Sequence, residues 1–473
     1  MIHLSRSDET VALDYREVAP KNACPEMFQL DERGEVKDKA NAIGPLAIAV
    51  PGVASGIATM VERYGTMKLR GICKFARDQA AKGTLTSPAI RLIIRENRDS
   101  SLQKFRRFKP TGEAFLKTTK PVQIRRTFSI PNLARTLDTI VREGMQSLHH
   151  GRLANEIVTY LRSKGAILKL EDLEDYSPKI RTPVTGTYRD VEICSIPPPS
   201  SGGLAIIETL NIVEGFDLSA MKHNSPETIH TIAEAMKLGY VDRCTYIADP
   251  DFVSVPTSKL CSKEHSDRLR SMIDQTSIGS DAFTDLSHGS NTSHLNVMDK
   301  EGNVVALTES IECYFGSGIL IPEVGLLMND EMHDFDPEPG RLNSVEPKKR
   351  PLSSMGPTIL FKDDRPYVAL GGAGGPRIIS SVVQTILNIV EFGMTLDQAV
   401  AAPRFHCQRD KVTVENGIRY NTLKALMTIG HRIETKPRND LFFGGVQAAM
   451  SDSAQGVYLG TADPRRDGIA LAF

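Results

Sequence analysis

The order of hydrophobic and polar residues predicts long helices in the first two thirds of the chain. Within residues 223–247, apolar side chains recur every three or four positions: Ile229, Ile232, Ala233, Met236 and Tyr240. Ser225 followed by Pro226 is typical of a helix start, since Ser caps free N–H groups and Pro suits the first helical position. We interpret this stripe as core rather than as a cofactor site. Residues 52–165 are also largely helical by pattern.

Strand patterns dominate after residue 292. Alternating or short apolar runs predict strands over 293–298, 304–311, 357–361 and 366–370, and a helix is expected after Gly375. Residues 1–15 predict two short strands around a turn at 5–9, and residues 257–290 predict a helix followed by an exposed polar tether. The pattern therefore indicates a mixed α/β protein.

The turn cluster Asp299–Asn303 predicts a hairpin between the first two strands of this part. Pairing Met298 with Val304 places Asn296 opposite Ala306, His294 opposite Thr308, and Thr292 opposite Ser310. One face is then apolar and expected to face the core: Leu295, Val297, Val305, Leu307 and Ile311. The other face is polar and expected to form a site: Thr292, His294, Asn296, Thr308, Ser310 and Glu312.

Composition narrows the function. The chain has 473 residues, 24% charged, with a net charge of −1, which favours neither a nucleic-acid nor a membrane partner. The start MIHLSRSDET has no apolar signal segment, so a cytoplasmic location is expected. Seven cysteines form no CxxC pair, and His149, His150 and His288 lack metal-site spacing. We therefore expect no disulfide framework, no metal and no cofactor.

Thr292 stands at the start of a predicted strand, in the stretch SNTSHLNVMDK. It can be part of a loop that caps the strand. Asn291-Thr292-Ser293 also matches a glycosylation sequon. A third interpretation makes Thr292 a nucleophile that becomes an N-terminus.

Two other stretches suit a ligand site. Ser353 and Ser354 present adjacent hydroxyls close in sequence to Arg350. The glycine-rich stretch 371–377 follows a predicted strand and precedes a helix. It lacks the Gly-Lys-Ser/Thr of a phosphate loop, so an oxyanion hole made by the N–H groups of Gly374 and Gly375 fits better.

Ten stretches together resemble the γ-glutamyltranspeptidase family of N-terminal nucleophile (Ntn) hydrolases. They are, in order, LDYREVAP, IPPPSSGG, VDRCTYIADPDFVSVP, NTSHLNVMDKEGNVV, FGSGI, GLLMNDEMHDF, KRPLSSMGPTI, GGAGGPRII, APRFH and GTADPR. Their common order and spacing favour the nucleophile over a plain loop at Thr292.

The resemblance implies a four-layer αββα sandwich, made as one precursor that cuts itself between Asn291 and Thr292. Residues 1–291 would form a large-subunit-like segment and residues 292–473 a small-subunit-like segment, intertwined in one domain. The product would be a heterodimer of the two fragments, or a dimer of such heterodimers. Site roles carry over by motif: Thr292 as nucleophile, Ser310 as its hydroxyl partner, Gly374 and Gly375 as oxyanion hole, Arg16 with Ser353 and Ser354 on the substrate α-carboxylate, and Glu331 with Asp334 on its α-ammonium.

The chemistry accounts for these residue types. A free α-amino group on Thr292 has a pKa of roughly 7.7–8.0 and can take the proton of its own hydroxyl. Before that, the Thr292 hydroxyl would attack the Asn291 carbonyl to form an ester that water opens. A zwitterionic substrate end needs a cation and anions held in place, which Arg16, Glu331 and Asp334 would supply.

The sequence also departs from the family. Ser293 and Ser310 stand where many members have Thr, and Glu312 replaces an amide that is common near the α-amino group. The stretch 335–349 is shorter than the lid region of several members. The sequence begins almost at the DYRE strand, which suggests a mis-assigned start, a truncated subfamily or an inactive product.

We therefore expect a self-processing γ-glutamyl hydrolase/transferase that acts on glutathione-like amides, with water or an amine as acceptor. The alternatives are a related Ntn acylase acting on another amide, in whose acyl pocket Glu312 would lie, and an unprocessed inactive homologue.

Overall fold

The computed structural model describes residues 1–96, 98–119, 122–273, 292–408, 411–452 and 456–473. The chain forms two compact units. The first comprises Met1–Ala12, Arg181–Glu309 and Leu352–Phe473, and the second comprises Leu13–Ile180 and Ser310–Pro351. Both units draw on residues before and after position 292. The division into subunit-like segments 1–291 and 292–473 stays a prediction.

A six-stranded sheet forms the centre of the first unit. Its strands, in spatial order, are β20 (Val457–Thr461), β19 (Gly445–Asp452), β15 (Arg365–Ala373), β14 (Thr358–Lys362), β9 (Val191–Ser195) and β8 (Val184–Tyr188). All neighbours are antiparallel. Apolar side chains of this sheet join those of the helices in one buried core.

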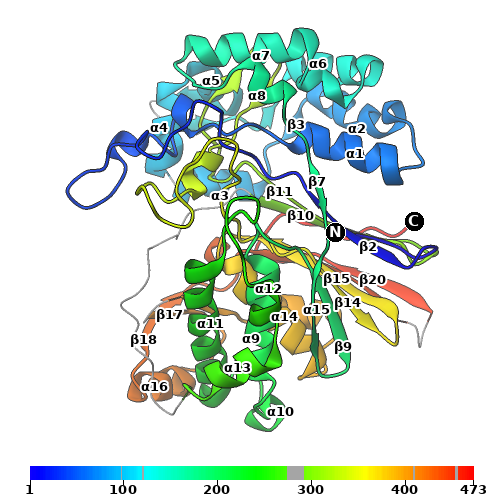
Figure 1. Ribbon diagram of the computed structural model, residues 1–473, viewed down its shortest axis with the longest axis vertical. Coiled ribbons are helices and arrows are strands. Elements are labelled where there is room, and N and C mark those ends of the chain that lie inside the picture. Colours follow the sequence, from blue (N-terminus) through cyan, green and yellow to red (C-terminus); the bar gives the residue numbers. More distant parts are fainter. Residues whose placement is uncertain (97, 120–121, 274–291, 409–410, 453–455) are drawn as a thin grey trace. The chain divides into compact units, whose positions relative to one another are not determined.

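The main helices of that core are α9 (Gly202–Val213), α11 (Pro226–Tyr246), α13 (Lys263–Arg270) and α14 (Arg377–Val390). Figure 1 shows α9, α11 and α13 side by side in green. The shorter helices are α10 (Leu218–Met221), α12 (Thr257–Leu260), α15 (Leu396–Ala401) and α16 (Tyr420–Thr428). A small sheet of β16 (Phe405–Cys407), β17 (Lys411–Glu415) and β18 (Arg432–Lys436) completes the set.

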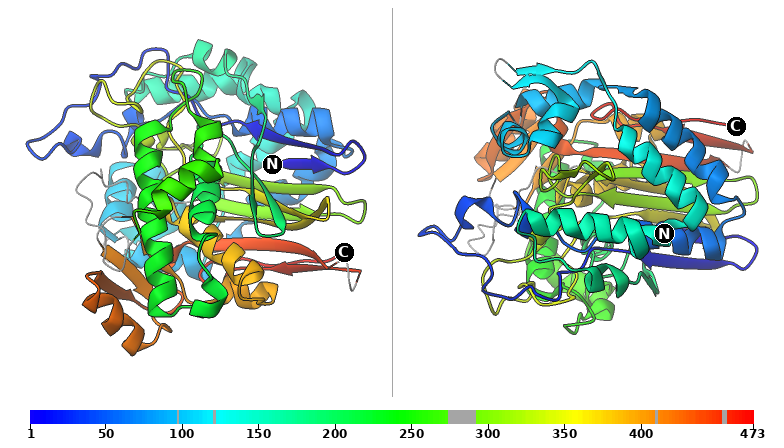
Figure 2. Two further views of the ribbon diagram at one scale, coloured as in Figure 1. Left: turned by 60° about the horizontal axis from the view of Figure 1, so that its bottom comes forward. Right: turned by 90° about the horizontal axis from the view of Figure 1, so that it is seen from above.

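A second sheet has the order β10 (Thr292–Met298), β11 (Val304–Ser310), β1 (Ile2–Leu4), β2 (Glu9–Asp14) and β7 (Lys179–Arg181). Its strand β10 packs on β15 and β19 of the larger sheet. In Figure 2 the yellow-green strands run alongside the yellow and red strands of that sheet. The first unit thus stacks helices on a sheet and that sheet on another.

The second unit is mainly helical. Its helices are α1 (Val53–Tyr64), α2 (Leu69–Lys82), α3 (Pro88–Glu96), α4 (Arg98–Arg107), α5 (Lys109–Phe115), α6 (Pro131–Glu143), α7 (Gly151–Ser163) and α8 (Leu170–Glu174). Short strands interrupt them: β3 (Thr84–Leu85), β4 (Leu116–Thr119), β5 (Val122–Ile124) and β6 (Thr127–Phe128). The later segment adds β12 (Leu320–Ile321), β13 (Leu326–Leu327) and the 3₁₀ turn η4 (Glu331–Asp334).

Most predicted elements are confirmed. Helix α11 begins at Pro226, and the Ser225 hydroxyl accepts a hydrogen bond from the Thr228 N–H (3.1 Å). The predicted hairpin is present, with β10 beside β11 and the Asp299 N–H donating to the Asn303 carbonyl (3.1 Å). The predicted tether falls mostly within residues 274–291, outside the described part of the chain. Among the described helices, none combines the length and the low polarity that a membrane crossing requires.

One prediction about the hairpin is wrong, namely which face of β10 turns inward. Leu295 and Val297 are 47% and 54% exposed, whereas the polar face is the more buried. The reason is that the polar face packs on the larger sheet, where its groups find partners. The Asn296 amide, for example, donates to the Gln447 carbonyl of β19 (2.8 Å). Burial of a polar group costs little when it is hydrogen-bonded, so polarity alone does not point a strand face toward water.

Candidate active site

Thr292 is the first residue of β10 and is buried, at 8% exposure. The predicted cut lies on its N-terminal side. The other residue of that bond, Asn291, lies outside the described residues. Because β10 packs on β15, the strand that leads into the glycine stretch, Thr292 and the glycines belong to neighbouring strands of the same unit.

Two residues along β10, His294 contacts both sheets. Its Nδ1 lies 2.8 Å from the Thr308 hydroxyl of β11, which confirms that these two positions face each other. Its Nε2 lies 3.0 Å from Asn296 Oδ1. Burial lowers the pKa of His294 to about 3, so the ring is neutral at pH 7. His294 is thus held by hydrogen bonds on β10 itself, two residues after Thr292.

The glycine stretch allows a close approach of backbone and ring. A Cβ on Gly371 would lie 2.3 Å from the Cε1 atom of His294. Gly374 and Gly375 follow the end of β15 and precede α14, with φ of 145° and 59°, which favour glycine. The two amides therefore stand at the start of a long helix, where N–H groups favour negative charge. This placement is compatible with the predicted oxyanion hole.

A loop from later in the chain supports the glycine stretch. A Cβ on Gly374 would lie 2.8 Å from the Gly444 Cα, and one on Gly444 would lie 2.2 Å from the Ala373 carbonyl oxygen. The Ser381 hydroxyl of α14 donates to the Phe443 carbonyl (2.8 Å). The loop 442–445 is thus held against both the glycines and the helix that follows them.

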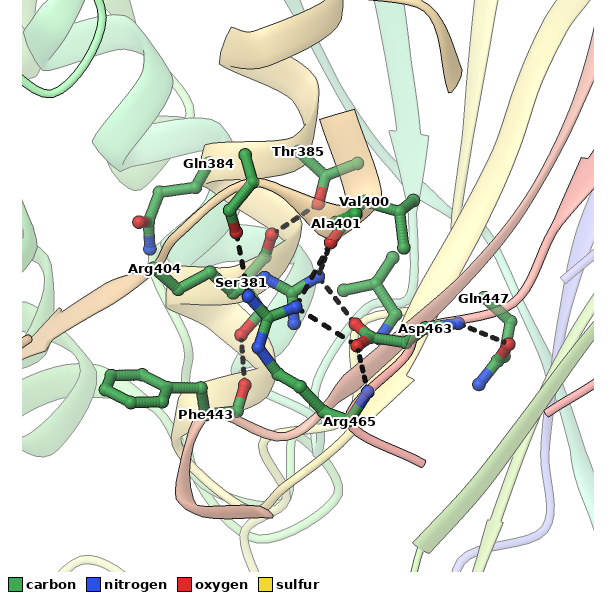
Figure 3. A network of polar contacts seen from close by, with 12 residues as sticks. Ser381, Gln384, Thr385, Val400, Ala401, Arg404, Phe443, Gln447, Asp463 and Arg465 are labelled. Atoms are coloured by element: carbon green, nitrogen blue, oxygen red, sulfur yellow. Dashed lines mark hydrogen bonds and ion pairs between the residues drawn. The ribbon is translucent and has the colours of Figure 1, made fainter. Parts of the chain in front are cut away.

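A buried ion network anchors this loop (Figure 3). Asp463 lies 2.7 Å from an Arg404 guanidinium nitrogen and 3.1 Å from one of Arg465, and it accepts from the Val446 N–H (2.8 Å). Burial opposes ionisation of Asp463, but Arg404 and Arg465 hold its pKa below the usual value. The APRFH and GTADPR stretches therefore act as structural supports in this unit rather than as reacting groups.

Ser353 and Ser354 lie in the first unit against the PPPSS stretch. The Ser201 N–H donates to the Ser353 carbonyl (2.8 Å). Arg243 donates to the Ser201 hydroxyl (2.8 Å) and to the Ser354 hydroxyl (3.1 Å). The cation beside these hydroxyls is thus Arg243 of α11, which sequence reasoning did not single out, although it lies in the VDRCTY stretch.

The second unit contains a buried cluster of charges around Arg16. The Arg16 guanidinium is ion-paired with Glu331 (2.8 Å) and with Asp334. Its Nε donates to the Pro351 carbonyl (3.2 Å), and its own carbonyl accepts from the Tyr176 hydroxyl (3.0 Å). These contacts bring Arg16 together with two other predicted substrate-binding residues, Glu331 and Asp334, which lie more than 300 positions further along the sequence.

A further carboxylate belongs to this cluster. Glu17 lies 4.0 Å from the Arg16 guanidinium and was not predicted, although it is the E of DYRE. Burial raises the pKa of Glu17 to about 7, against the effect of Arg16. Burial also raises the pKa of Glu331. Although its own burial acts in the opposite direction, the surrounding carboxylates raise the pKa of Arg16. The cluster therefore has more carboxylates than cations.

Ser310 and Glu312 complete the set of predicted residues in the second unit. Ser310 ends β11, and its hydroxyl accepts from the Glu312 N–H (2.9 Å). Glu312 is buried with a φ of 66°, and a carboxylate oxygen of it lies within 4.8 Å of those of Glu331 and Asp334. A left-handed backbone at a residue other than glycine is uncommon and clusters at functional sites.

Each unit thus assembles part of the predicted set. The first holds Thr292, Ser353, Ser354, Gly374 and Gly375, and the second holds Arg16, Ser310, Glu312, Glu331 and Asp334. The individual roles of these residues stay predictions.

Comparison with known proteins defines the class. The structure resembles a cephalosporin acylase from Bacillus halodurans with a TM-score of 0.84 and 27% identity, over 98% of this chain and 85% of that one. It also resembles the γ-glutamyltranspeptidase of Helicobacter pylori, with a TM-score of 0.54 and 36% identity over 58% of this chain and 77% of that one. The fold is therefore that of the Ntn hydrolases, and the fold class predicted from the sequence is confirmed.

The family follows from the sequence comparisons. The sequence pattern described as Gamma-glutamyltranspeptidase matches residues 1–473. The chain is 34% identical to the glutathione hydrolase proenzyme of Escherichia coli (strain K12), over 98% of this chain and 82% of the relative. It is 33% identical to the acylase ACY 1 proenzyme of Pseudomonas sp. (strain SE83), over 98% of this chain and 83% of the relative. The chain belongs to the Gamma-glutamyltranspeptidase family, and it is an enzyme of the Ntn hydrolase/transferase type.

Proposed function

We propose that this chain cuts itself before Thr292 and then transfers γ-glutamyl groups from glutathione-like amides to water or to an amine. The observation that carries the acyl specificity is the buried cluster of Arg16, Glu331 and Asp334. It offers one guanidinium and several carboxylates, which match the α-carboxylate and the α-ammonium of a γ-glutamyl group. The named glutathione hydrolase relatives support the same substrate class.

The proposed reaction has two steps at Thr292. The hydroxyl attacks the γ-carbonyl carbon, and the α-amino group of the same residue accepts the hydroxyl proton. The tetrahedral oxyanion would be stabilised by the N–H groups of Gly374 and Gly375. The C–N bond then breaks, the leaving amine takes the proton from the α-ammonium group, and a γ-glutamyl ester remains.

In the second step, water or an amine attacks the ester. The α-amino group removes a proton from the acceptor and returns it to the Thr292 oxygen as the ester bond breaks. Hydrolysis releases glutamate, and transfer to an amine releases a new γ-glutamyl amide. Thr292 is buried, with 8% of its surface exposed. Burial limits the number of water molecules that can reach the ester, which supports the proposed competition between water and an amine.

The mature enzyme would be a heterodimer of its own two fragments. The two fragments would arise from a single reaction, the cleavage of the chain before Thr292 by the chain itself. No nucleic acid or membrane is needed as a partner in this proposal.

The competing proposal is an acylase that takes another acyl group. One observation favours it, namely the similarity of this chain to the acylase ACY 1 proenzyme and to a cephalosporin acylase. A dicarboxylic acyl group such as glutaryl has no α-ammonium. It therefore offers no positive charge to pair with the carboxylates of Glu331, Asp334 and Glu312. The cluster therefore favours γ-glutamyl over glutaryl acyl groups.

A panel of matched anilides tests the proposal. The purified processed enzyme should hydrolyse γ-glutamyl anilide with a kcat/KM at least about tenfold above that for glutaryl anilide, because charge-assisted bonds to the ammonium contribute about 1.5–3 kcal/mol. The two substrates differ only in the α-amino group, so each is the control for the other. Equal rates, or a preference for glutaryl anilide, would assign the chain to the acylases instead.

A further inference from the structure

Three residues with metal-binding side chains meet next to the charged cluster of the second unit. Cys313 follows β11, and its Sγ lies 3.4 Å from the Nδ1 atom of His333 in η4. A carboxylate oxygen of Glu312 lies within 4.8 Å of both atoms. Thiolate, imidazole and carboxylate are the three side-chain ligands typical of zinc.

The distance between sulfur and nitrogen fits a shared metal ion. Zinc binds sulfur at about 2.3 Å and histidine nitrogen at about 2.0–2.1 Å, so a tetrahedral site separates the two atoms by about 3.5 Å. Cys313 and His333 are therefore already spaced as ligands of one ion. One Glu312 carboxylate oxygen lies within 4.8 Å of both atoms and is the third ligand of this group.

Backbone geometry and charge point to a cation as well. Glu312 is held in a left-handed conformation, which directs a buried carboxylate to this place at an energetic cost. The described cations of this region are already paired, Lys104 with Asp330 (3.4 Å) and Arg16 with Glu331 (2.8 Å). Carboxylates remain in excess, and a dication would reduce their mutual repulsion.

We propose that Glu312, Cys313 and His333 bind a divalent cation of the zinc type. The ion would replace the thiol proton of Cys313, which would be released to solvent, and would leave a fourth coordination position open. The local sequence gave no sign of such a site, because Cys313 and His333 lie 20 positions apart and neither belongs to a spaced pair. This inference replaces the expectation of a chain without a metal site.

Two other groups of histidines and carboxylates among the described residues do not suit a metal as well. In one, His230 and His431 lie near Glu234, but the Lys237 ammonium already contacts that carboxylate (2.6 Å). In the other, His265 lies 2.5 Å from Asp242, and an Arg268 nitrogen lies 3.4 Å from the second ring nitrogen. Neither of these groups contains a thiol, which the proposed site has in Cys313.

Metal binding would affect turnover through Glu312, which is shared with the predicted ammonium pocket. Zinc should therefore inhibit competitively with γ-glutamyl substrates. This consequence rests on the proposed function, whereas binding of the ion itself does not.

Cobalt substitution tests the site directly. The purified enzyme is stripped with a chelator and titrated with Co²⁺, which produces an absorption band in the near ultraviolet when a thiolate is a ligand. The band should appear with wild type and with the control Cys24→Ser, whose cysteine is exposed and elsewhere in the unit. It should be lost with Cys313→Ser. Absence of the band in wild type, or its persistence in Cys313→Ser, would overturn the proposal.

A second variant covers the case that Cys313→Ser folds poorly. His333→Gln keeps the thiol but removes the imidazole, so Co²⁺ affinity should fall by about tenfold or more while the unfolding temperature of the metal-free protein stays within a few degrees of wild type. An unchanged affinity would remove His333 from the site and contradict the proposal. Because these readouts need no substrate, they are independent of whether the enzyme prefers γ-glutamyl groups.

Discussion

Among single residues, Arg16 lies at the centre of the buried charge cluster of the second unit. A buried ion pair contributes little to stability, because desolvation offsets most of the attraction. The several carboxylates around Arg16 are thus better explained by ligand recognition than by folding. A guanidinium that is already held by Glu331 and Asp334 is preorganised for a substrate carboxylate.

Arg16→Lys tests this role. Lysine keeps the charge but loses the planar, two-pronged geometry, so the KM for γ-glutamyl substrates should rise about ten- to hundredfold. Self-cleavage should be unaffected, because it needs no substrate carboxylate. Steady-state kinetics on the processed variant, with a gel as the control for processing, would measure this. Unchanged kinetics would mean that Arg16 does not contact the α-carboxylate.

Glu312→Gln tests the most informative departure from the family. The change removes one charge but keeps a hydrogen-bond acceptor, and charge-assisted bonds exceed neutral ones by about 1 kcal/mol. The kcat/KM for γ-glutamyl anilide should therefore fall roughly fivefold. Glutaryl anilide, which lacks the α-amine, should be hydrolysed no worse. An equal loss for both substrates would show that Glu312 does not bind the ammonium.

At the scale of the element, the strand-to-helix turn at Gly374 connects β15 to α14 and combines two constraints. Its φ of 145° disfavours any side chain, and a Cβ would approach the Gly444 Cα to 2.8 Å. The same turn carries the two N–H groups of the predicted oxyanion hole. Geometry and chemistry thus both depend on glycine here.

Gly374→Ala should lower kcat about 100-fold, because displacing an oxyanion donor costs about that much. Gly393→Ala is the matched control, since Gly393 also has a positive φ (59°) but has open space around it. That control should lose about 1 kcal/mol of stability and keep its kcat. Similar kcat values for the two variants would remove Gly374 from the reaction.

Local signals explain why many elements could be predicted from the sequence. Ser225 caps the start of α11 with its hydroxyl, and the ring of Pro226 holds φ at a helical value. Both effects depend only on residues that are neighbours in the sequence. The hairpin between β10 and β11 follows from its turn residues and alternation. The orientation of β10 did not follow, because it depends on which sheet packs on it. The contact of His294 with Gly371 joins segments that are far apart in the sequence.

The site residues were predictable mainly by resemblance. Position in a motif predicted Thr292, Arg16 and Glu331 as site residues, but no local pattern pairs residue 16 with residue 331, which form an ion pair in the structure. Arg243 lay in a recognised stretch without an assigned role, and its contact with Ser354 needs the folded chain. Cys313 and His333 carried no spacing signal at all. Contacts between distant segments are therefore what the sequence alone could not supply.

At the scale of the whole molecule, buried neutral histidines make stability depend on pH. Burial lowers the pKa of His406 from 6.5 to about 3, so between these values the unfolded chain binds a proton that the folded chain does not. Stability contributed by this group is therefore present above pH 6.5 and is lost as the pH falls toward 3. The slope is about 1.4 kcal/mol per pH unit for one such group.

His406→Gln should reduce this slope. Between pH 6 and pH 4, the free energy of unfolding in urea should fall less for the variant than for wild type, by about 1.4 kcal/mol per pH unit. Ser380→Ala is the control, because it removes the hydroxyl 2.9 Å from His406 Nδ1 but keeps the imidazole. It should keep the steep slope. A variant slope equal to that of wild type would contradict a neutral buried His406.

N-terminal sequencing of the purified protein shows whether this chain makes its own nucleophile by cutting itself before Thr292. Incubation at neutral pH without protease should yield two fragments, and the smaller should begin Thr-Ser-His-Leu. Thr292→Ala should remain one chain, because no hydroxyl is left to attack the Asn291 carbonyl, whereas the control Ser293→Ala should still be cut. A wild-type chain that stays whole after long incubation, or a fragment that begins at another residue, would contradict the account.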